Sequence, residues 1–97
     1  MVRHIVMLKL FSNEEKRNNI QILTSKLEKL PQKVEQIKLY EVNKNISPKK
    51  NAYDIILISE FENFEALDVY RTHPEHVKVL NVIKKVTEKS AFIDYEV

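Results

Sequence analysis

The chain has 97 residues, with 16 lysines and arginines against 14 aspartates and glutamates, so its formal net charge is only +2. That balance is too weak to favour nucleic acid or an anionic membrane as a partner. Cysteine is absent, which excludes disulfides, thiolate metal sites and a cysteine nucleophile, and we therefore expect a cytoplasmic protein. Glycine is also absent, which excludes phosphate-binding loops that need close backbone approach.

The length indicates one domain over residues 1–97, near the low end of the usual range. No stretch approaches the length of a transmembrane helix, and the apolar run near the N-terminus is too short and too regularly alternating for a signal peptide. A chain of this size buries a modest core, so a partner subunit would add to its stability.

Residues 2–11 alternate along the chain and predict a strand, with His4 on one face and Ile5 on the other. Ser12 and Glu15 have the spacing of a capping box, so a helix is expected to begin there. The residues that follow carry an apolar stripe at helical spacing, which gives this helix one buried face.

Pro31 ends the helix, and a second strand is predicted over residues 34–42. We assign Tyr40 and Val42 in this strand to the sheet face away from the helices. Residues 43–52 are rich in lysine, proline and asparagine, which predicts an exposed loop that is longer than the median connection.

A third strand is predicted over residues 53–61, whose centre is apolar on both faces, as in strands that are covered on both sides. Asn63 is expected to cap the next helix. His73 precedes Pro74, and this pair should end that helix and begin another, because a residue before proline avoids the α region. Residues 90–97 alternate again and predict the last strand.

The order β-α-β-β-α-β predicts an α+β, ferredoxin-like fold with an antiparallel four-stranded sheet, in which both helical segments cover one face. The other face would carry ten apolar residues, namely Ile5, Met7, Phe11, Tyr40, Val42, Ile56, Ile58, Ile93, Tyr95 and Val97. An apolar patch of that size is unusual on a monomer, so we expect two copies to pack sheet against sheet as a homodimer. The alternative is a monomer with an unusually apolar, hydrated sheet.

Four polar side chains are expected on the helix-covered side of the sheet. His4 comes from the first strand, Tyr70 and His76 from the helical segments, and Asp94 from the last strand. Such a cluster can orient an imidazole as a general base, with the carboxylate fixing its tautomer. The other interpretation is that these are core or rim residues satisfied by one another, by the backbone or by water.

His73 and His76 are three residues apart, but H-E-x-x-H and similar metal-binding spacings are missing. Since Pro74 makes His73 a helix cap, we expect no metal. RNA-recognition motifs share the same fold plan, yet their signature contains glycine and several exposed aromatic residues. The predicted third strand instead has Ile-Ile-Leu-Ile at its centre, so we expect no nucleic-acid partner.

Four segments together resemble the stress-responsive α/β-barrel domain family. They are residues 2–10, residues 53–57, the Tyr-x-x-His-Pro-x-His motif at residues 70–76 and residues 92–95. The resemblance covers essentially the whole chain, and it implies a homodimer whose sheets pack face to face into a barrel. One plant member of the family closes the ring of a linear polyketide by aldol condensation, without metal or cofactor.

The essential histidine and tyrosine of that plant member resemble His76 and Tyr70, a further pocket histidine resembles His4, and an aspartate near the pocket matches Asp94. The resemblance thus implies cofactor-free proton transfer on a small apolar or carbonyl-bearing ligand held between sheet and helices. His76 would be the base and Tyr70 the donor to the oxyanion, while His4 and Asp94 would orient the reacting groups.

This sequence departs from the plant member at two places. Asn43 replaces the usual glycine after the second strand, in an expected left-handed turn, and Ile20 and Leu23 replace aromatic residues on the first helix. Two alternatives stay open. One is a non-catalytic, stress-associated dimeric module, and the other is a haem- or oxygen-handling enzyme of the related dimeric ferredoxin-like oxygenases, which has fold-level support alone.

Overall fold

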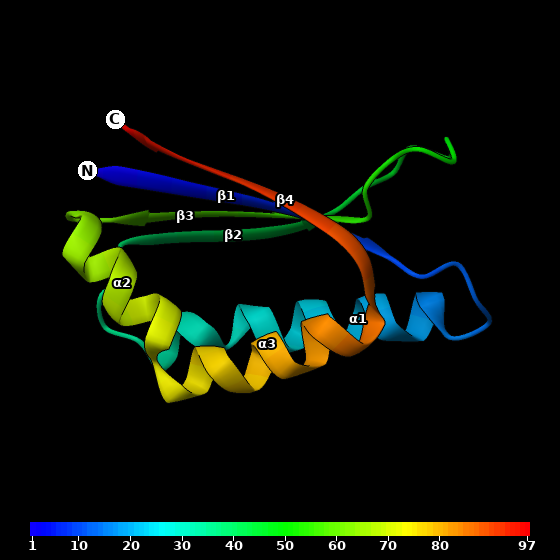
Figure 1. The fold of residues 1–97 in the computed structure, drawn as a ribbon, viewed down its shortest axis with the longest axis horizontal. Helices are drawn as coiled ribbons and strands as arrows, with labels where there is room; N and C mark the ends of the chain where they lie inside the picture. The colour runs from blue at the N-terminus through cyan, green and yellow to red at the C-terminus, as the bar shows by residue number, and fades with distance from the viewer.

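The computed structural model describes residues 1–97, in which one four-stranded sheet has helices packed on one of its faces (Figure 1). The elements are β1 (Val2–Leu10), α1 (Lys16–Glu28), a short 3-10 helix η1 (Leu30–Gln32), β2 (Leu39–Lys44), β3 (Ile55–Phe61), α2 (Phe64–Thr72), α3 (Pro74–Val86) and β4 (Thr87–Glu96). All neighbouring strands are antiparallel, in the order β2-β3-β1-β4. This is the predicted ferredoxin-like βαββαβ fold, with the second helical segment divided at Pro74.

The two predicted caps around α2 and α3 are confirmed. Asn63 Oδ1 accepts the N–H of Ala66 at 2.9 Å at the start of α2. His73 is extended, its Nδ1 accepts the N–H of Glu75 at 3.1 Å, and Pro74 occupies the first turn of α3. The chain therefore bends at the residue before proline, where an extended backbone is favoured.

The start of α1 differs from the predicted capping box. The helix begins at Lys16, and its N-cap residue Glu15 makes no capping bond through its side chain. Asn13 Oδ1 instead accepts the N–H of Glu15 at 2.9 Å, while Ser12 lies outside the helix and is exposed. The short asparagine side chain satisfies the backbone locally and takes the place of the serine cap.

The prediction for the second strand was wrong in both its start and its faces. β2 begins at Leu39. Val34, the predicted first residue of the strand, is buried in the turn that follows η1. Tyr40 and Val42 pair with buried residues of β3, so both side chains face the helices and not the open side. Since side chains alternate, a parity error of one residue reverses every assignment in the strand.

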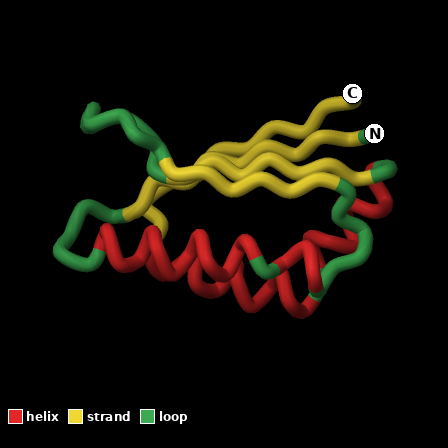
Figure 2. The backbone as a smooth tube through the Cα atoms, turned by 180° about the vertical axis from the view of Figure 1, so that it is seen from behind, coloured by secondary structure: helices red, strands yellow, loops and turns green.

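Two smaller expectations were also wrong. No residue of the chain has a positive φ, and Asn43, expected in a left-handed turn, lies within β2 opposite Ile56. β4 begins at Thr87 rather than at residue 90, directly after α3, and Thr87 pairs with Leu10 beyond an irregularity in β1. The connection between β2 and β3 extends past the end of the sheet, as expected of a long exposed loop (Figure 2).

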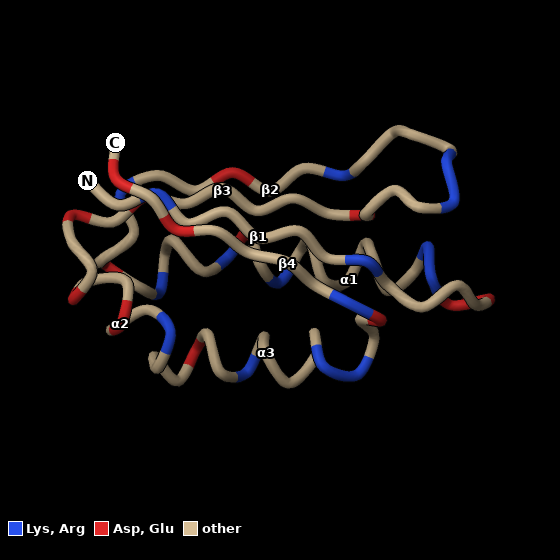
Figure 3. Tube along the Cα trace, turned by 45° about the horizontal axis from the view of Figure 1, so that its top comes forward, with Lys and Arg blue, Asp and Glu red and all other residues tan.

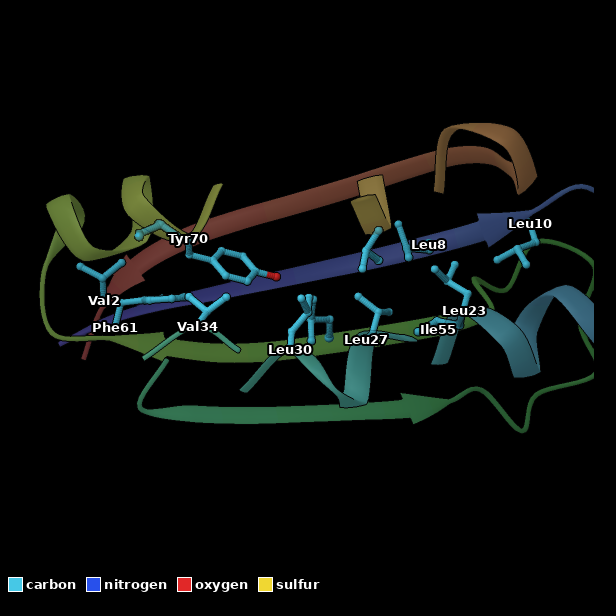
Figure 4. Packing of buried hydrophobic residues seen from close by; sticks show 13 residues of the cluster. Val2, Leu8, Leu10, Leu23, Leu27, Leu30, Val34, Ile55, Phe61 and Tyr70 are labelled. Carbon is cyan, nitrogen blue, oxygen red and sulfur yellow. The ribbon is translucent and has the colours of Figure 1, made fainter. Parts of the chain in front are cut away.

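The core lies between the sheet and the helices (Figure 4). Thirteen buried hydrophobic residues form one cluster, and its largest members, Tyr70 and Phe61, pack with ring centroids 5.1 Å apart. α3 is less deeply buried, since His76 and Val79 are its only buried residues. None of the helices is long and apolar enough to cross a membrane.

The opposite face of the sheet carries no helix (Figure 1). Ile58, Ile5 and Ile93 form one row across β3, β1 and β4, and Ile56, Met7 and Ala91 form the next row. β2 contributes Glu41 and Asn43 to this face. Figure 3 shows charged residues mainly on the helices, on the loops and toward the strand ends, with an acidic position midway along the edge strand β2, so the middle of β3, β1 and β4 is largely uncharged.

Candidate functional site

A pocket of about 540 Å³ lies between α3 and the β1–β4 side of the sheet. Nine of its fourteen lining residues are hydrophobic, and its volume falls in the range of small-molecule sites. All four residues predicted from the sequence, His4, Tyr70, His76 and Asp94, line this pocket. The structure therefore brings together the complete predicted set, from two strands and two helices.

His4 and Asp94 face each other because the register of β1 and β4 pairs them directly. Nδ1 of His4 donates to Oδ1 of Asp94. An ionised carboxylate only accepts, so Nδ1 of His4 carries a hydrogen toward Asp94, and Nε2 is the ring nitrogen that has no partner within the chain. The two side chains expose only 9% and 11% of their surface, which makes this a largely buried pair.

Arg71 holds the second oxygen of Asp94, and sequence analysis missed this residue. Its Nη2 donates to Oδ2 at 2.6 Å, so the carboxylate bridges His4 and Arg71. Burial by itself raises the pKa of Asp94, but the hydrogen bond and charge of His4, followed by those of Arg71, hold that pKa below its ordinary value of 3.8. The one available signal was the place of Arg71 inside the Tyr-x-x-His-Pro-x-His motif.

His76 is held by the main chain. Its Nδ1 donates to the carbonyl oxygen of Arg71 at 3.0 Å, so this ring also carries hydrogen on Nδ1 and has a free Nε2. Burial lowers the pKa of His76 below 6.5, and the hydrogen bond to the carbonyl opposes this only in part. The imidazole is therefore neutral at pH 7, with Nε2 able to accept a proton.

The free nitrogens of both histidines are accessible. Thr87 Oγ1 is the only buried side-chain polar atom that lacks a hydrogen-bond partner. Nε2 of His4 and Nε2 of His76 have no partner within the chain either, so neither atom can be fully enclosed. Both rings line the pocket, and the chain itself leaves the hydrogen-bonding capacity of both Nε2 atoms unused.

Tyr70 borders the same end of the pocket, but its side chain is 0% exposed. Its ring packs on His76 with centroids 4.1 Å apart, and its hydroxyl shares a hydrogen bond of 3.1 Å with the hydroxyl of Tyr40. Figure 4 shows this hydroxyl pointing into the interior. Burial raises the pKa of Tyr70 to about 12, although the bond to Tyr40 lowers it, so the phenol keeps its proton at neutral pH.

Tyr40 and Phe92 are further residues near the site that sequence analysis did not assign to it. In the sequence analysis, Tyr40 was placed on the wrong face. Polar Glu41 and Asn43 alternate with Tyr40 and Val42, and this alternation indicated that Tyr40 and Val42 face the core. Phe92 lies on the helix-covered face of the edge strand β4, is 68% exposed, and has its ring centroid 6.2 Å from that of His4. An exposed phenyl ring at the side of the pocket favours contact with an apolar ligand.

His73 lies outside the pocket and acts as the cap of α3, as the sequence predicted. The chain has no group of three or more His, Cys, Asp or Glu side chains placed to hold a metal ion. The polar side chains that line the pocket are two imidazoles, one carboxylate, one guanidinium, one enclosed phenol and the hydroxyl group of Ser90.

Comparison with known proteins agrees with this fold. A dimeric protein of unknown function with a ferredoxin-like fold, from Bacteroides fragilis, is 36% identical with a TM-score of 0.90, over 99% of this chain and 95% of that one. A protein from Arabidopsis thaliana is 27% identical with a TM-score of 0.81, over 100% and 95%. A hydroxynitrile lyase from Passiflora edulis, at 16% identity and a TM-score of 0.85 over 99% and 92%, shares the fold. A search of curated proteins gave no match.

The family model described as the stress responsive A/B barrel domain matches residues 2–97. This match spans the strands, the helices and all four predicted pocket residues. It confirms the resemblance drawn from the four sequence segments. The chain belongs to the stress responsive A/B barrel domain family.

Proposed function

We propose that residues 1–97 form one domain that works as a homodimer, joined through the uncovered sheet face. The rows through Ile5 and Met7 present a continuous apolar strip to solvent. Burial against a second copy removes that strip from water, and each fully buried large aliphatic side chain contributes about 1.5–3 kcal/mol. The relative from Bacteroides fragilis, at 36% identity, is itself described as dimeric, which supports the same assembly here.

Each protomer, in this proposal, binds a small and largely apolar molecule that carries an uncharged carbonyl group. The walls of the pocket are mostly aliphatic, and its polar end offers hydrogen-bonding groups. The charge of Arg71 is already matched by Asp94, with Asp68 nearby at 3.5 Å. No unmatched cation remains there to bind a carboxylate, and this favours an uncharged ligand.

The proposed chemistry is proton transfer without a cofactor. His76 takes a proton from an acidic C–H or O–H of the ligand onto Nε2, and negative charge develops on the ligand's carbonyl oxygen. His4, held by Asp94, orients the ligand at the same end of the pocket. Tyr70 donates to the developing oxyanion once that oxygen reaches the enclosed hydroxyl. The observation that carries this proposal is the His76 Nδ1 bond to the Arg71 carbonyl, which leaves Nε2 unprotonated beside an apolar cavity.

A second candidate function is a dimeric module without catalysis, and one observation favours it. His4, Asp94 and Arg71 satisfy one another, and the Tyr70 hydroxyl is paired with Tyr40 and closed off from solvent. In that case the polar residues stabilise the fold, and the pocket has no specific ligand.

An NMR titration of protein labelled with ¹⁵N-histidine separates the two candidates. We expect acetophenone to shift the ring signals of His4 and His76 in a saturable way. Ethylbenzene, which lacks the carbonyl, and benzoate, which is charged, should bind more weakly. Saturable binding of benzoate in preference to acetophenone would contradict the uncharged class, and no saturable shift with any of the three would favour the module.

A further inference from the structure

The side chain of Arg71 controls the carboxylate that orients His4. Nη2 of Arg71 donates to Oδ2 of Asp94 at 2.6 Å, while Oδ1 of the same group accepts from His4. With both oxygens held, Asp94 cannot rotate without losing a charge-assisted hydrogen bond. The guanidinium is itself placed by Asp68, 3.5 Å from Nη1, and by the ring of Phe64, whose centroid is 5.8 Å away.

The main chain of Arg71 controls the other imidazole. In a continuing helix its carbonyl oxygen would accept the N–H of Glu75, four residues on. α2 ends at Thr72, and His73 Nδ1 takes that N–H at 3.1 Å as the cap of α3. The carbonyl of Arg71 is therefore free to accept Nδ1–H of His76 at 3.0 Å.

We propose that Arg71 is the positioning residue for both imidazoles, with its side chain fixing His4 through Asp94 and its main-chain carbonyl fixing the tautomer of His76. This inference rests on the proposed function, because two free Nε2 atoms on one pocket are the groups that would handle the ligand's proton. It also assigns separate roles to residues of the Tyr-x-x-His-Pro-x-His motif. His73 caps α3 and thereby leaves the Arg71 carbonyl free to accept a hydrogen bond. Arg71 orients His4 through its side chain and His76 through its main-chain carbonyl.

The side-chain half of the proposal is tested with Arg71→Gln, in protein labelled with ¹⁵N-histidine and without ligand. We expect the hydrogen-bonded Nδ1–H resonance of His4 to be lost or to move strongly upfield, while His76 keeps its Nδ1–H tautomer. Arg71→Lys should restore part of the His4 signal, since an ammonium group can donate to one oxygen without the paired geometry of the guanidinium. The matched control is Arg17→Gln on the exposed side of α1, which should leave the His4 signal unchanged.

The main-chain half is tested with His73→Ala. This change removes the acceptor of the Glu75 N–H, which can then turn to the carbonyl of Arg71. His76 should lose its fixed tautomer and show signals from both ring forms, while His4 is unchanged. His73→Asn is the matched control, because asparagine is also a strong helix cap, and it should keep the wild-type spectrum of His76.

An unchanged His4 Nδ1–H resonance in Arg71→Gln, or an unchanged His76 tautomer in His73→Ala, would overturn the proposal. If Arg71→Gln does not fold, Arg71→Lys decides, because it must still alter His4 and spare His76. These spectra need no ligand, so they fail or succeed separately from the acetophenone titration. Predicted spectra with a failed titration would reject the ligand and keep the positioning role of Arg71.

Discussion

The hydroxyl groups of Tyr40 and Tyr70 share a hydrogen bond of 3.1 Å, between the edge strand β2 and α2. The two rings lie edge to face, with centroids 6.4 Å apart. Burial raises the pKa of Tyr70 to about 12 and raises the pKa of Tyr40 well above its ordinary value, so both phenols stay protonated. The pair ties the far edge of the sheet to the polar end of the pocket.

Tyr40→Phe should destabilise the protein by about 1–3 kcal/mol, because it leaves the enclosed Tyr70 hydroxyl without a partner. Tyr70→Phe should cost less, since the half-buried Tyr40 hydroxyl can turn toward water. The double variant should be more stable than the sum of the two single effects predicts, as urea denaturation can measure. Strictly additive effects would show that the two hydroxyls are not coupled.

Ile5→Lys should disrupt the proposed dimer, because it places a charge between Ile58 and Ile93 on the uncovered face. We expect light scattering to give the wild type twice the chain mass of 11.5 kDa and the variant a monomer mass or aggregates. Val77→Lys is the matched control, because Val77 is an exposed aliphatic residue on α3. A wild-type monomer at micromolar concentration would reject the dimer.

Asp94→Asn should lower the free energy of unfolding at neutral pH by about 1–3 kcal/mol, because His4 and Arg71 lose a charged acceptor. The pKa of Asp94 is depressed in the folded protein, so the unfolded chain takes up this proton first as the pH falls. The advantage of the wild type over Asp94→Asn should thus be complete at neutral pH and shrink below about pH 5. Urea denaturation measures this difference, and a difference in free energy of unfolding that stays the same at all pH values would contradict this linkage.

His76 should titrate below 6.5, since burial lowers its pKa. The unfolded chain binds the proton more readily, so the contribution of the neutral ring to stability is present above pH 6.5 and is lost as the pH falls through the folded pKa. NMR titration of the ring gives the midpoint directly. In His76→Gln, the free energy of unfolding measured with urea should lack this contribution to its dependence on pH. A midpoint at or above 6.5 would mean that the ring is not desolvated as the structure shows.

Alternation along the chain was enough to predict the fold and the faces of its two neighbouring strands β1 and β4. It placed His4 and Asp94 on the helix-covered side without knowledge of how the strands pair. Their direct contact depends on the register between the first and last strands, which no local pattern specifies. The sequence therefore predicted a common face, and the assembled sheet supplied the hydrogen bond.

Arg71 and Tyr40 were missed for different physical reasons. The reach of Arg71 to Asp94 depends on where α2 lies across the sheet, a tertiary feature that the helix pattern does not contain. Tyr40 was misplaced because Ile37 was read as part of the strand, whereas it lies in the turn before β2. Val34 was also assigned to this strand, but it is buried in the segment before β2, so the apolar run in the sequence begins before the strand does.

In the proposed function, His76 transfers protons on an uncharged carbonyl compound bound in the pocket. The most direct measurement is the exchange of the methyl protons of acetophenone in D₂O, followed by NMR with wild type, His76→Gln and the surface control Lys85→Gln. We expect wild type and Lys85→Gln to exchange these protons at least about 100-fold faster than His76→Gln, the low end of general-base contributions. Equal rates for wild type and His76→Gln, or a wild-type rate no faster than that of buffer alone, would contradict the account.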